Sequence, residues 1–371
     1  MISKSDTFTS RFFKVGAVGS FLLLVIIIYL LLPDILNAIK LILTDPPALL
    51  ETDIFKLIIF PGLLYISIVP LIAEWVERKI VAKMQVRVGP LYVGGWEGVL
   101  QPIADLLKLL SKEIIIPRNA DKMVFILSPV LAFIIGALPS IVIPYSPNYV
   151  IWNYQFGVVL FFAVLSFYPL AVLTAAWSSN NKYSFIGGLR ALYQLASYEV
   201  PLFLSTLPSV MLSNSLSLMG IAESQSKIWF IALAPVSAIV FFIAMMAELE
   251  RIPFDTPEAD SELVTGWTTE YAGMAWGLLQ FASYVKLTAF SGVFVVLFLG
   301  GWQGPSLLPP VVWTLIKVGV VILLLLLARG YYPRIRIDQL VRGGWSWLIP
   351  LSIINILALF AAQPFVASLV R

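Results

Sequence analysis

Residues 311–329 read VVWTLIKVGVVILLLLLAR, an apolar run whose interior contains a single charge, Lys317. A helix of about 20 such residues spans the hydrocarbon core of a bilayer. Similar runs recur along the whole chain, without the ten-residue alternation that is typical of membrane β-barrels. We therefore predict an all-α polytopic membrane protein with about nine transmembrane helices. Their approximate bounds are 14–32, 54–76, 122–143, 152–177, 194–212, 228–247, 274–300, 311–329 and 346–368.

Composition supports this class and limits the chemistry. Of 371 residues, 60% are hydrophobic and 12% are charged, about half the charged share of a soluble domain. The absence of Cys and His excludes thiolate clusters, imidazole metal sites and ordinary haem ligation. We expect this chain to bind no metal or flavin, so any redox cofactor must lie on another subunit. The net charge of +3 is spread over loops, which indicates lipid headgroups as partners and no nucleic acid.

The Lys and Arg residues predict the orientation. Most of the 24 fall in the N-terminal segment and in the loops near 77–121, 178–193, 248–273 and 330–345, which alternate spans place on one side. Because positive loops face the cytoplasm, we predict a cytoplasmic N-terminus, an outer C-terminus and a multi-pass protein of the cell membrane or an equivalent energy-transducing membrane.

Two further patterns concern helix shape. Prolines fall inside several spans, where neighbouring helices can satisfy the freed backbone groups, so we expect tilted and broken helices. These prolines are Pro61, Pro70, Pro129, Pro139, Pro201 and Pro208. Residues 99–116 have apolar side chains at helical spacing on one face and Asp105, Lys108 and Lys112 on the other. This pattern predicts an amphipathic helix along the membrane surface or beneath a soluble partner.

One loop concentrates acid. Seven of the 21 Asp and Glu residues lie between residues 248 and 270, with Arg251 as the one cation among them. Carboxylates this close disfavour double ionisation, so some should hold protons near neutral pH. Pro253 and Pro257 prevent one continuous helix, although Glu258 and Glu262 could share a helical face. A solvated acidic loop is the simpler alternative.

Charges inside the spans are the other candidates. Glu199 lies in a span, where an unpaired charge costs about 3 kcal/mol or more, unless it is an interfacial residue near a helix start. Lys286 lies deep in its span, and its partner cannot be identified from the sequence. Arg87, Arg190 and Arg251 are the expected counter-charges to the acidic loop.

Ordered motifs connect these charges to a known family. They are Glu77-Arg78-Lys79, Gln85-x-Arg87-x-Gly89-Pro90, Leu100-Gln101-Pro102-x-Ala104-Asp105-x-x-Lys108, Leu189-Arg190-Ala191, Ser197-Tyr198-Glu199, Ala247-Glu248, Arg251-x-Pro253-Phe254-Asp255, Ser261-Glu262-Leu263-Val264-x-Gly266, Glu270-Tyr271 and Tyr332-Pro333-Arg334-x-Arg336-x-Asp338-Gln339-Leu340. In order and spacing the set resembles the H-type membrane subunit of respiratory complex I, the NADH dehydrogenase subunit 1 family. The resemblance covers about 54–365 and leaves 1–53 as an extra N-terminal span and loop.

The resemblance implies a function shared with other subunits. It implies a subunit of a proton-translocating oxidoreductase that passes electrons from NADH, or from a reduced deazaflavin or ferredoxin, to quinone. This chain would form the wall of the quinone chamber, with no complete active site and with quinone as a substrate shared with its neighbours. The implied partners are peripheral-arm subunits carrying the terminal iron–sulfur cluster, antiporter-like and small membrane-arm subunits, and lipids.

The resemblance also implies three sets of site residues. The proton path would comprise Glu199, Glu248, Asp255, Glu258, Glu262 and Glu270. Arg78, Arg87, Arg190 and Arg251 would line the quinone chamber or pair with its charges. Asp105, Lys108, Arg334, Arg336 and Asp338 would contact the peripheral arm. Simple topology anchoring is an interpretation at least as good as quinone contact for Arg78, Lys79, Arg334 and Arg336.

The pattern has departures and alternatives. Ser283 stands where many family members carry a Glu in the seventh span, and Leu91 stands where Asn is common. Glu74 and Glu250 are additional carboxylates. Three other functions stay open: the homologous subunit of a membrane-bound hydrogenase, a stand-alone ion transporter that uses Glu199 and Lys286, and a passive scaffold for peripheral subunits.

Overall fold

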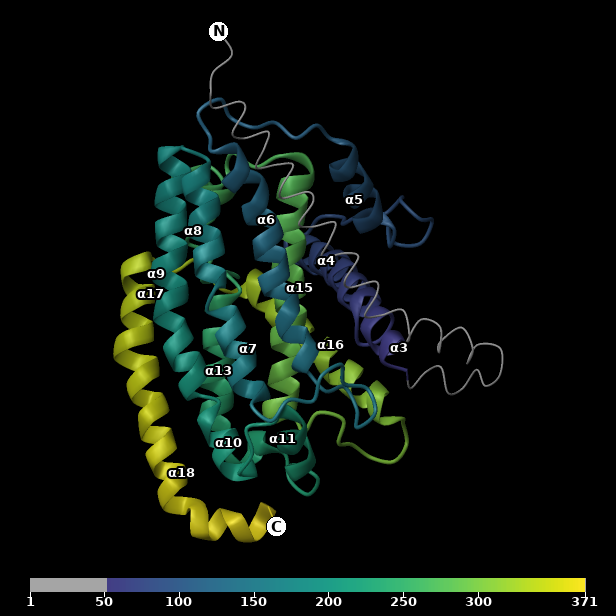
Figure 1. Cartoon of the computed structure of the whole chain (residues 1–371), viewed down its shortest axis with the longest axis vertical. Coiled ribbons are helices and arrows are strands. Elements are labelled where there is room, and N and C mark those ends of the chain that lie inside the picture. The colour runs from purple at the N-terminus through teal and green to yellow at the C-terminus, as the bar shows by residue number, and fades with distance from the viewer. Residues whose placement is uncertain (1–51, 371) are drawn as a thin grey trace, which may run out of the picture.

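The structure, a computed structural model, describes residues 52–370 as a bundle of helices with no strand in that range (Figure 1). The predicted span 14–32 lies outside the described residues. The helices are α3 (Asp53–Ile58), α4 (Leu63–Met84), α5 (Gln101–Ser111), α6 (Lys122–Ala137), η1 (Leu138–Val142), α7 (Gly157–Leu165), α8 (Tyr168–Ser178), α9 (Lys182–Leu204), α10 (Leu207–Ser213), α11 (Leu218–Ser224), α12 (Phe230–Leu233), α13 (Pro235–Glu248), α14 (Asp260–Leu263), η2 (Gly266–Thr268), α15 (Gly273–Phe298), α16 (Pro310–Tyr331), α17 (Ile337–Gly343), η3 (Gly344–Leu348) and α18 (Ile349–Val370).

Within this part of the chain, seven helical segments are long and apolar enough to cross a membrane. They are Asp53–Met84, Lys122–Val142, Gly157–Ser178, Lys182–Ser213, Gly273–Phe298, Pro310–Tyr331 and Ile337–Ala362. A shorter apolar helix, Pro235–Glu248, corresponds to the predicted span 228–247. The polytopic helical architecture is therefore confirmed. The fifth predicted span begins twelve residues earlier than expected, at Lys182 instead of 194, because the polar first turns of α9 hid its start from hydropathy.

Helix α15 forms the centre of the bundle. Its membrane-crossing window is 83% buried, whereas that of the C-terminal segment is 17% buried. It packs against α6, α4, α16, α5 and α13. Phe290, Phe294 and Phe298 project from it into the main hydrophobic core and contact aromatic rings of α7 and α13. Residues of α15 are consequently positioned on several sides by rigid neighbours.

Prolines break some spans and not others. Pro139 is the second residue of the 3₁₀ turn η1, and Pro208 is the second residue of α10. Proline is tolerated in a first turn because the missing N–H has no helical partner there. The span α7–α8 is interrupted at Ser166 and Phe167, just before Pro169. Pro70, Pro129 and Pro201 lie inside helices instead. The predicted broken helices are present, but only part of the proline set produces them.

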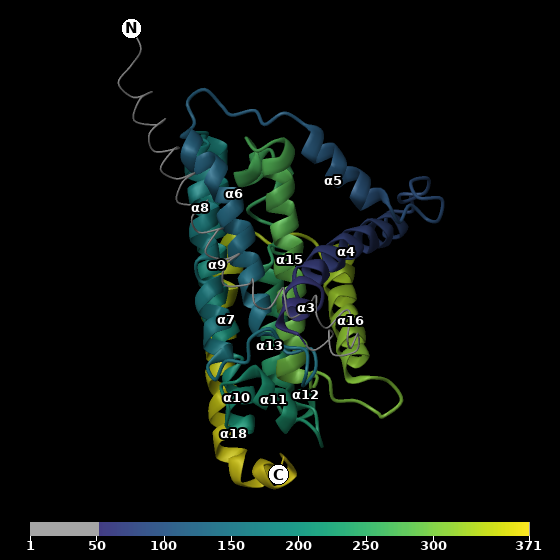
Figure 2. The ribbon, with the colours of Figure 1, turned by 45° about the vertical axis from the view of Figure 1, so that its right-hand side comes forward.

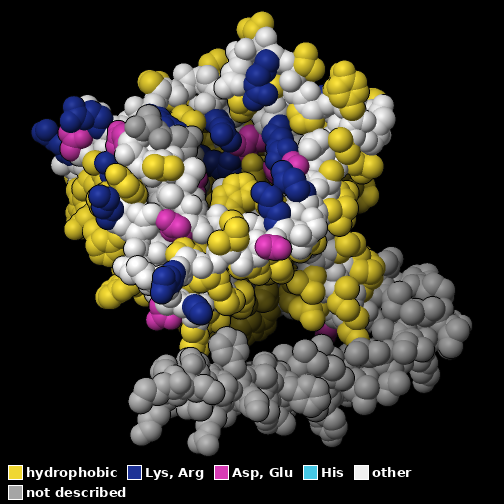
Figure 3. All heavy atoms as spheres, turned by 90° about the horizontal axis from the view of Figure 1, so that it is seen from above, with side chains coloured by type: hydrophobic (Ala, Val, Ile, Leu, Met, Phe, Trp, Pro, Cys, Tyr) yellow, Lys and Arg dark blue, Asp and Glu magenta, His cyan; other side chains and the backbone are white. Residues whose placement is uncertain are grey.

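One end of the bundle collects the polar loops. The α4–α6, α8–α9, α13–α15 and α16–α17 connections lie toward this end, and Lys, Arg, Asp and Glu side chains gather on it (Figure 3). Helix α5 extends across it, above the inclined α4 (Figure 2). These connections were predicted to share one side, and they do. That this side faces the cytoplasm stays a prediction.

The surface helix is shorter than expected. It was predicted over 99–116, but α5 ends at Ser111 and the chain continues extended from Lys112. Proline disfavours helical geometry at the preceding residue, so Pro117 favours the extended form at Ile116. The β-branched residues Ile114 and Ile115 also favour an extended backbone. Ile103, Leu107 and Leu110 are exposed on α5. Their apolar face is therefore free to meet a membrane or a partner subunit.

Candidate functional site: two adjoining charged cavities

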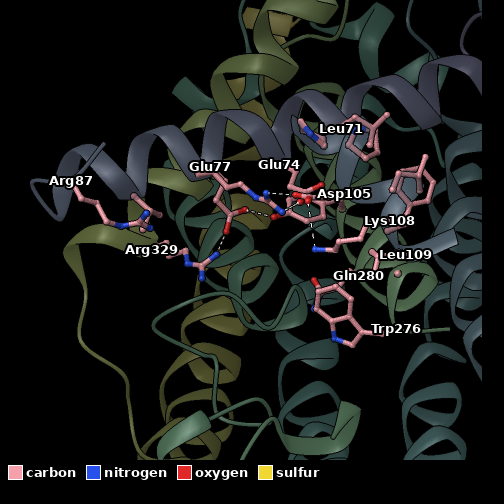
Figure 4. Close-up of a pocket in the computed structure, with 18 residues that line it drawn as sticks. Leu71, Glu74, Glu77, Arg87, Asp105, Lys108, Leu109, Trp276, Gln280 and Arg329 are labelled. Atoms are coloured by element: carbon pink, nitrogen blue, oxygen red, sulfur yellow. Dashed lines mark hydrogen bonds and ion pairs between the residues drawn. The ribbon is translucent and has the colours of Figure 1, made fainter. Parts of the chain in front are cut away.

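A cavity of about 400 Å³ opens between α4, α5, α15 and α16 near the polar end (Figure 4). We call it the α4–α15 cavity. Its polar lining consists of Glu74, Glu77, Arg78, Arg87, Asp105, Lys108, Gln280, Tyr284 and Arg329. Leu71, Leu106, Leu109, Trp276 and Phe281 are among its apolar lining residues. The combination of aromatic surface and convergent polar groups is typical of small-molecule sites.

Glu77 anchors the charges of this cavity. Its side chain is 2% exposed and accepts two hydrogen bonds from Arg251 Nη1, at 2.7 Å to Oε2 and 2.9 Å to Oε1. Arg329 also donates to Oε1, and the Tyr284 hydroxyl donates to Oε2 at 2.9 Å. A buried carboxylate requires such partners, because an unpaired charge in the interior is strongly unfavourable. Glu77 thereby joins α4, the acidic loop, α15 and α16.

The outer part of the cavity carries a second network. Arg78 pairs with Glu74 one turn earlier on α4 and with Asp105 on α5. Lys108 Nζ lies 3.7 Å from Asp105 Oδ1, and Gln101 donates to the same oxygen at 3.2 Å. The polar face of α5 therefore faces the cavity. Asp105 and Lys108 were expected at the peripheral-arm contact, and the structure places both in the cavity lining.

A smaller cavity of about 150 Å³ lies beside the first, and we call it the acidic-loop cavity. Gln280, Tyr284 and Arg329 line both cavities, so the two are neighbours. The other lining residues are Tyr168, Leu249, Glu250, Arg251, Ile252, Asp255, Glu258, Trp267, Thr268, Leu279 and Ser283. Part of the acidic loop is therefore folded inward instead of lying free in solvent.

Glu250 of this loop has a strongly perturbed carboxyl group. Burial, and then the negative charge of Glu258, raise its pKa from the ordinary 4.5 to about 8. Ser283 lines the same cavity, and its hydroxyl donates to the Gln280 carbonyl at 2.9 Å. The position where the resemblance suggested a carboxylate is therefore neutral, and an additional carboxyl group, Glu250, lies in the cavity that Ser283 lines.

Lys286 has a partner that the sequence could not identify. Its Nζ lies 2.9 Å from Glu248 Oε1 and donates to the Glu248 backbone carbonyl at 2.6 Å. The ammonium group also lies 3.7 Å from the centroid of the Tyr168 ring, which adds a cation–π attraction. Both charged side chains are buried, with 1% of Lys286 and 4% of Glu248 exposed. This ion pair joins α15 to the end of α13.

Glu199 lies on α9 at the break between α7 and α8. The hydroxyl of Ser166, the residue at that break, donates to Glu199 Oε1. Glu199 also lies close enough to Glu248 for a repulsive electrostatic interaction between the two carboxylates. The predicted intramembrane carboxylate is thus held by protein and lies near the buried Lys286–Glu248 pair.

Other predicted site residues gather in a third cavity of about 210 Å³. Arg190 pairs there with Glu262, and Arg334 donates to Asp255 Oδ2 at 2.9 Å. Arg336 Nε and Asp338 Oδ1 are 3.5 Å apart, and both side chains are well exposed. The structure therefore brings Arg190 to a carboxylate of the acidic loop.

The structure contradicts two interpretations of charges within the acidic loop. Glu258 and Glu262 do not share a helical face, because α14 begins only at Asp260, and the two residues line different cavities. Arg251 was expected to neutralise the acidic loop, but its guanidinium pairs with Glu77 of α4 and stacks 4.6 Å from the Tyr284 ring centroid. Long-range packing decides both outcomes, since the loop folds back against α4 and α15.

Two predicted residues have more peripheral positions. Arg87 was expected to be a counter-charge to the acidic loop, but it lines the α4–α15 cavity instead, where its Nε donates to Gln85 Oε1 at 2.7 Å. Glu270 accepts a hydrogen bond from Asn181, whose side chain also caps the start of α9. Glu270 therefore joins the acidic loop to α9, outside the three cavities described above.

Sequence reasoning omitted several residues of the site. Glu77 appeared only as part of a motif, and Arg329, Tyr284 and Tyr168 were not singled out. Glu250 was noted only as an additional charge. A carboxylate within an apolar span signals a paired or functional group, but Glu77 lies one residue beyond the predicted span 54–76, and only the structure extends α4 past it to Met84. The aromatic partners offer no comparable signal, because most aromatic residues in such a chain lie in the core or at the membrane interface.

Fold and site together define a polytopic helical membrane protein with adjoining charged cavities at one end. A model of the NADH dehydrogenase family matches residues 56–360. The H subunit of the NADH-quinone oxidoreductase of Bacillus cytotoxicus is 45% identical over 283 residues, which cover 76% of this chain and 85% of that protein. The second H subunit of the same enzyme from Syntrophobacter fumaroxidans is 43% identical over 292 residues, covering 76% and 88%. The chain belongs to the NADH dehydrogenase family.

Proposed function

We propose that this chain is the membrane subunit that forms the wall of the quinone chamber in an NADH-quinone oxidoreductase and couples quinone reduction to proton translocation. Family membership and the names of the relatives support the enzyme class. The α4–α15 cavity is the single observation that carries the assignment of the substrate site.

The chemistry of this cavity suits a quinone headgroup. A quinone presents a flat apolar ring and carbonyl oxygens that accept hydrogen bonds. Trp276, Phe281 and Leu109 offer apolar surface, and Lys108, Gln280 and Tyr284 offer donors. The cavity volume of about 400 Å³ lies within the usual range of small-molecule sites, roughly 300–1,000 Å³.

Charge on the reduced quinone provides the coupling. Electrons delivered by a neighbouring subunit make the quinone oxygens negative until they receive protons. Arg329 lines the cavity, and Glu77 holds both Arg329 and Arg251. A negative quinone competes with Glu77 for these two arginines and shifts the charge balance of the acidic-loop cavity. We propose that Glu248, Asp255, Glu258 and Glu262 respond to this shift, on a proton path that includes Glu199.

The polar end provides the partner surface. Arg336 and Asp338 are exposed there, and we assign this end to the peripheral subunits that carry the terminal iron–sulfur cluster. The lateral faces of the bundle are assigned to lipids and to antiporter-like and small membrane-arm subunits. The distribution of Lys and Arg supports a cell-membrane location with the polar end in the cytoplasm.

Photoaffinity labelling tests the quinone site. We expect a photoreactive quinone analogue, added to the purified complex, to label peptides of α4, α5 or α15, with protection by native quinone. Glu77→Gln should weaken this protection and slow quinone reduction, because it removes the charge that fixes Arg251 and Arg329. The matched control is Glu97→Gln, since Glu97 is an exposed partner of Lys79 outside the cavity.

Other outcomes would favour the alternative functions. Labelling confined to other subunits, with full activity of Glu77→Gln, would contradict the site. Ion transport by the isolated chain in proteoliposomes would favour a stand-alone transporter. Loss of assembly with normal turnover per assembled complex would favour a scaffold. A co-purifying subunit with nickel-binding cysteines would favour a membrane-bound hydrogenase.

A further inference from the structure

We propose that Glu250 is the proton-storing group of the acidic-loop cavity, which holds a proton at neutral pH and passes it to Glu258. The inference deepens the proposed coupling function and rests on it for its biological role. The protonation of Glu250 itself can be tested without quinone.

The backbone places Glu250 in an unusual position. It follows the end of α13 with a φ of 52°, in the left-handed region. The Arg251 N–H donates to the Met246 carbonyl and the Glu250 N–H to the Ala247 carbonyl, both at 3.2 Å, which is the hydrogen-bond pattern of a Schellman C-cap. Glycine is the usual residue at this position, because a side chain is sterically strained there. Glu250 therefore departs from the usual glycine C-cap.

The side chain ends in the acidic-loop cavity without a hydrogen-bond partner. Oε1 of Glu250 is buried and makes no hydrogen bond with any residue in the described range 52–370. A buried carboxylate oxygen without a donor is unfavourable, whereas a carboxylic acid carries less charge to desolvate and can itself donate a proton. The geometry of this site favours the neutral form.

The surrounding charges favour the same form. Glu258, Glu248 and Asp255 repel a charge on Glu250, and Lys286 attracts it. That attraction is shared, because Lys286 is already paired with Glu248. The cavity also contains two arginines and two tyrosines, namely Arg251, Arg329, Tyr168 and Tyr284. Both arginines are paired with Glu77. The pKa of about 8 that results for Glu250 is close to the working pH, where a carboxyl group can both release and regain a proton.

Glu258 is the acceptor in this scheme. It exerts the largest of the charge effects on Glu250 and lines the same cavity. When Glu250 releases its proton, its O–H bond breaks, a new O–H bond forms on Glu258, and the negative charge moves from Glu258 to Glu250. The total charge of the pair is unchanged. Movement of Arg251 or Arg329 toward a reduced quinone in the adjoining α4–α15 cavity alters the field across this pair.

Infrared spectroscopy of the full chain in lipid nanodiscs provides the test. The carbonyl stretch of a protonated carboxylic acid should disappear with a midpoint near pH 8 in the unmodified chain. It should be absent in Glu250→Gln and in Glu250→Gly, the second of which relieves the left-handed backbone and keeps the fold. Glu223→Gln is the matched control, because Glu223 is exposed on α11 at the opposite end of the bundle, and it should keep the band.

The same variants then test the role in the assembled complex. We expect Glu250→Gln to lower proton translocation per quinone reduced and to remove the transition near pH 8 from its pH profile. A carbonyl band that is still present in both Glu250 variants, and still disappears with a midpoint near pH 8, would overturn the assignment. Normal proton translocation by Glu250→Gln in the complex would overturn the proposed role. Failure of quinone photolabelling would instead contradict the proposed function, and would leave the infrared band in place.

Discussion

Lys286 on α15 holds Glu248 at the end of α13 twice, through a side-chain ion pair at 2.9 Å and through the Glu248 backbone carbonyl at 2.6 Å. One side chain thereby fixes both the charge of Glu248 and the position of the helix end from which the acidic loop departs. The pair is buried within a membrane-spanning bundle, so each partner depends on the other for its charge.

We predict that Lys286→Met will strongly destabilise the assembled complex. Removing one partner of a buried ion pair leaves the other charge uncompensated, at a typical cost of about 3–5 kcal/mol. The double variant Lys286→Met with Glu248→Gln should recover much of this loss, which a double-mutant cycle of thermal unfolding measures. Lys56→Met is the control, because its partner Asp53 is almost fully exposed and an exposed pair contributes about 1 kcal/mol or less. Simple additivity of the two single variants would contradict the coupling.

We predict that Tyr284→Phe will weaken quinone reduction with little effect on assembly. The substitution removes a hydrogen bond to the buried carboxylate of Glu77 and keeps the ring beneath Arg251. A hydrogen bond to a charged group contributes about 1.5–3 kcal/mol, so a change in kcat/KM of roughly tenfold or more is expected. Steady-state quinone reduction by the purified complex measures it. Tyr331→Phe, an exposed tyrosine at the end of α16, should behave like the unmodified protein.

We predict that Glu250 makes the stability of the protein depend on pH. Its pKa is raised in the folded state from 4.5 to about 8, so the folded state binds the proton more tightly than the unfolded state does. The free energy of unfolding contributed by this group therefore falls as pH rises through the window from 4.5 to 8, by up to about 1.4 kcal/mol per pH unit. Thermal unfolding at several pH values should show a steeper fall for the unmodified protein than for Glu250→Gln. Parallel curves would contradict the raised pKa.

We predict that Ser166→Ala will impair proton translocation more than quinone binding. The variant removes the hydroxyl that donates to Glu199, a carboxylate that interacts electrostatically with Glu248 and does not line the acidic-loop cavity. Proton uptake per quinone reduced, measured in proteoliposomes with the complete complex, should fall while the KM for quinone stays unchanged. Ser224→Ala, which removes a local hydrogen bond on α11, is the control. A change in KM alone would place Ser166 on the quinone side of the mechanism.

The sequence was sufficient for the architecture because long apolar runs have one solution in a bilayer. It located the acidic loop, Glu199 and the pairing of Arg190 with that loop. It could not assign Arg251 to Glu77, because 174 residues separate the two positions and only the packed bundle brings them together. It misjudged Glu258 and Glu262 for a local reason: helical spacing predicts a shared face only where a helix forms, and α14 begins after Glu258.

Lys286 and Glu250 illustrate a further limit. An isolated cation in an apolar run, such as Lys286, indicates that an acidic partner is needed but does not identify it. Any of the seven acidic-loop carboxylates could neutralise the same charge. The raised pKa of Glu250 arises mainly from burial. The hydropathy of the sequence does not predict whether a single loop residue is buried. Both features became visible only when the turn after α13 was placed against α15.

Helix α15 contributes Trp276, Gln280 and Tyr284 to the α4–α15 cavity and, half a turn beyond Tyr284, carries Lys286 into the bundle. Two residues correspond to about 3 Å of rise along a helix. A compound that fills the cavity and contacts Tyr284 therefore acts on the same helix, α15, whose Lys286 pairs with Glu248. If the proposed function holds, an inhibitor of this pocket would not need to block quinone completely, because a small displacement of α15 would disturb the Lys286–Glu248 pair on the proposed proton path.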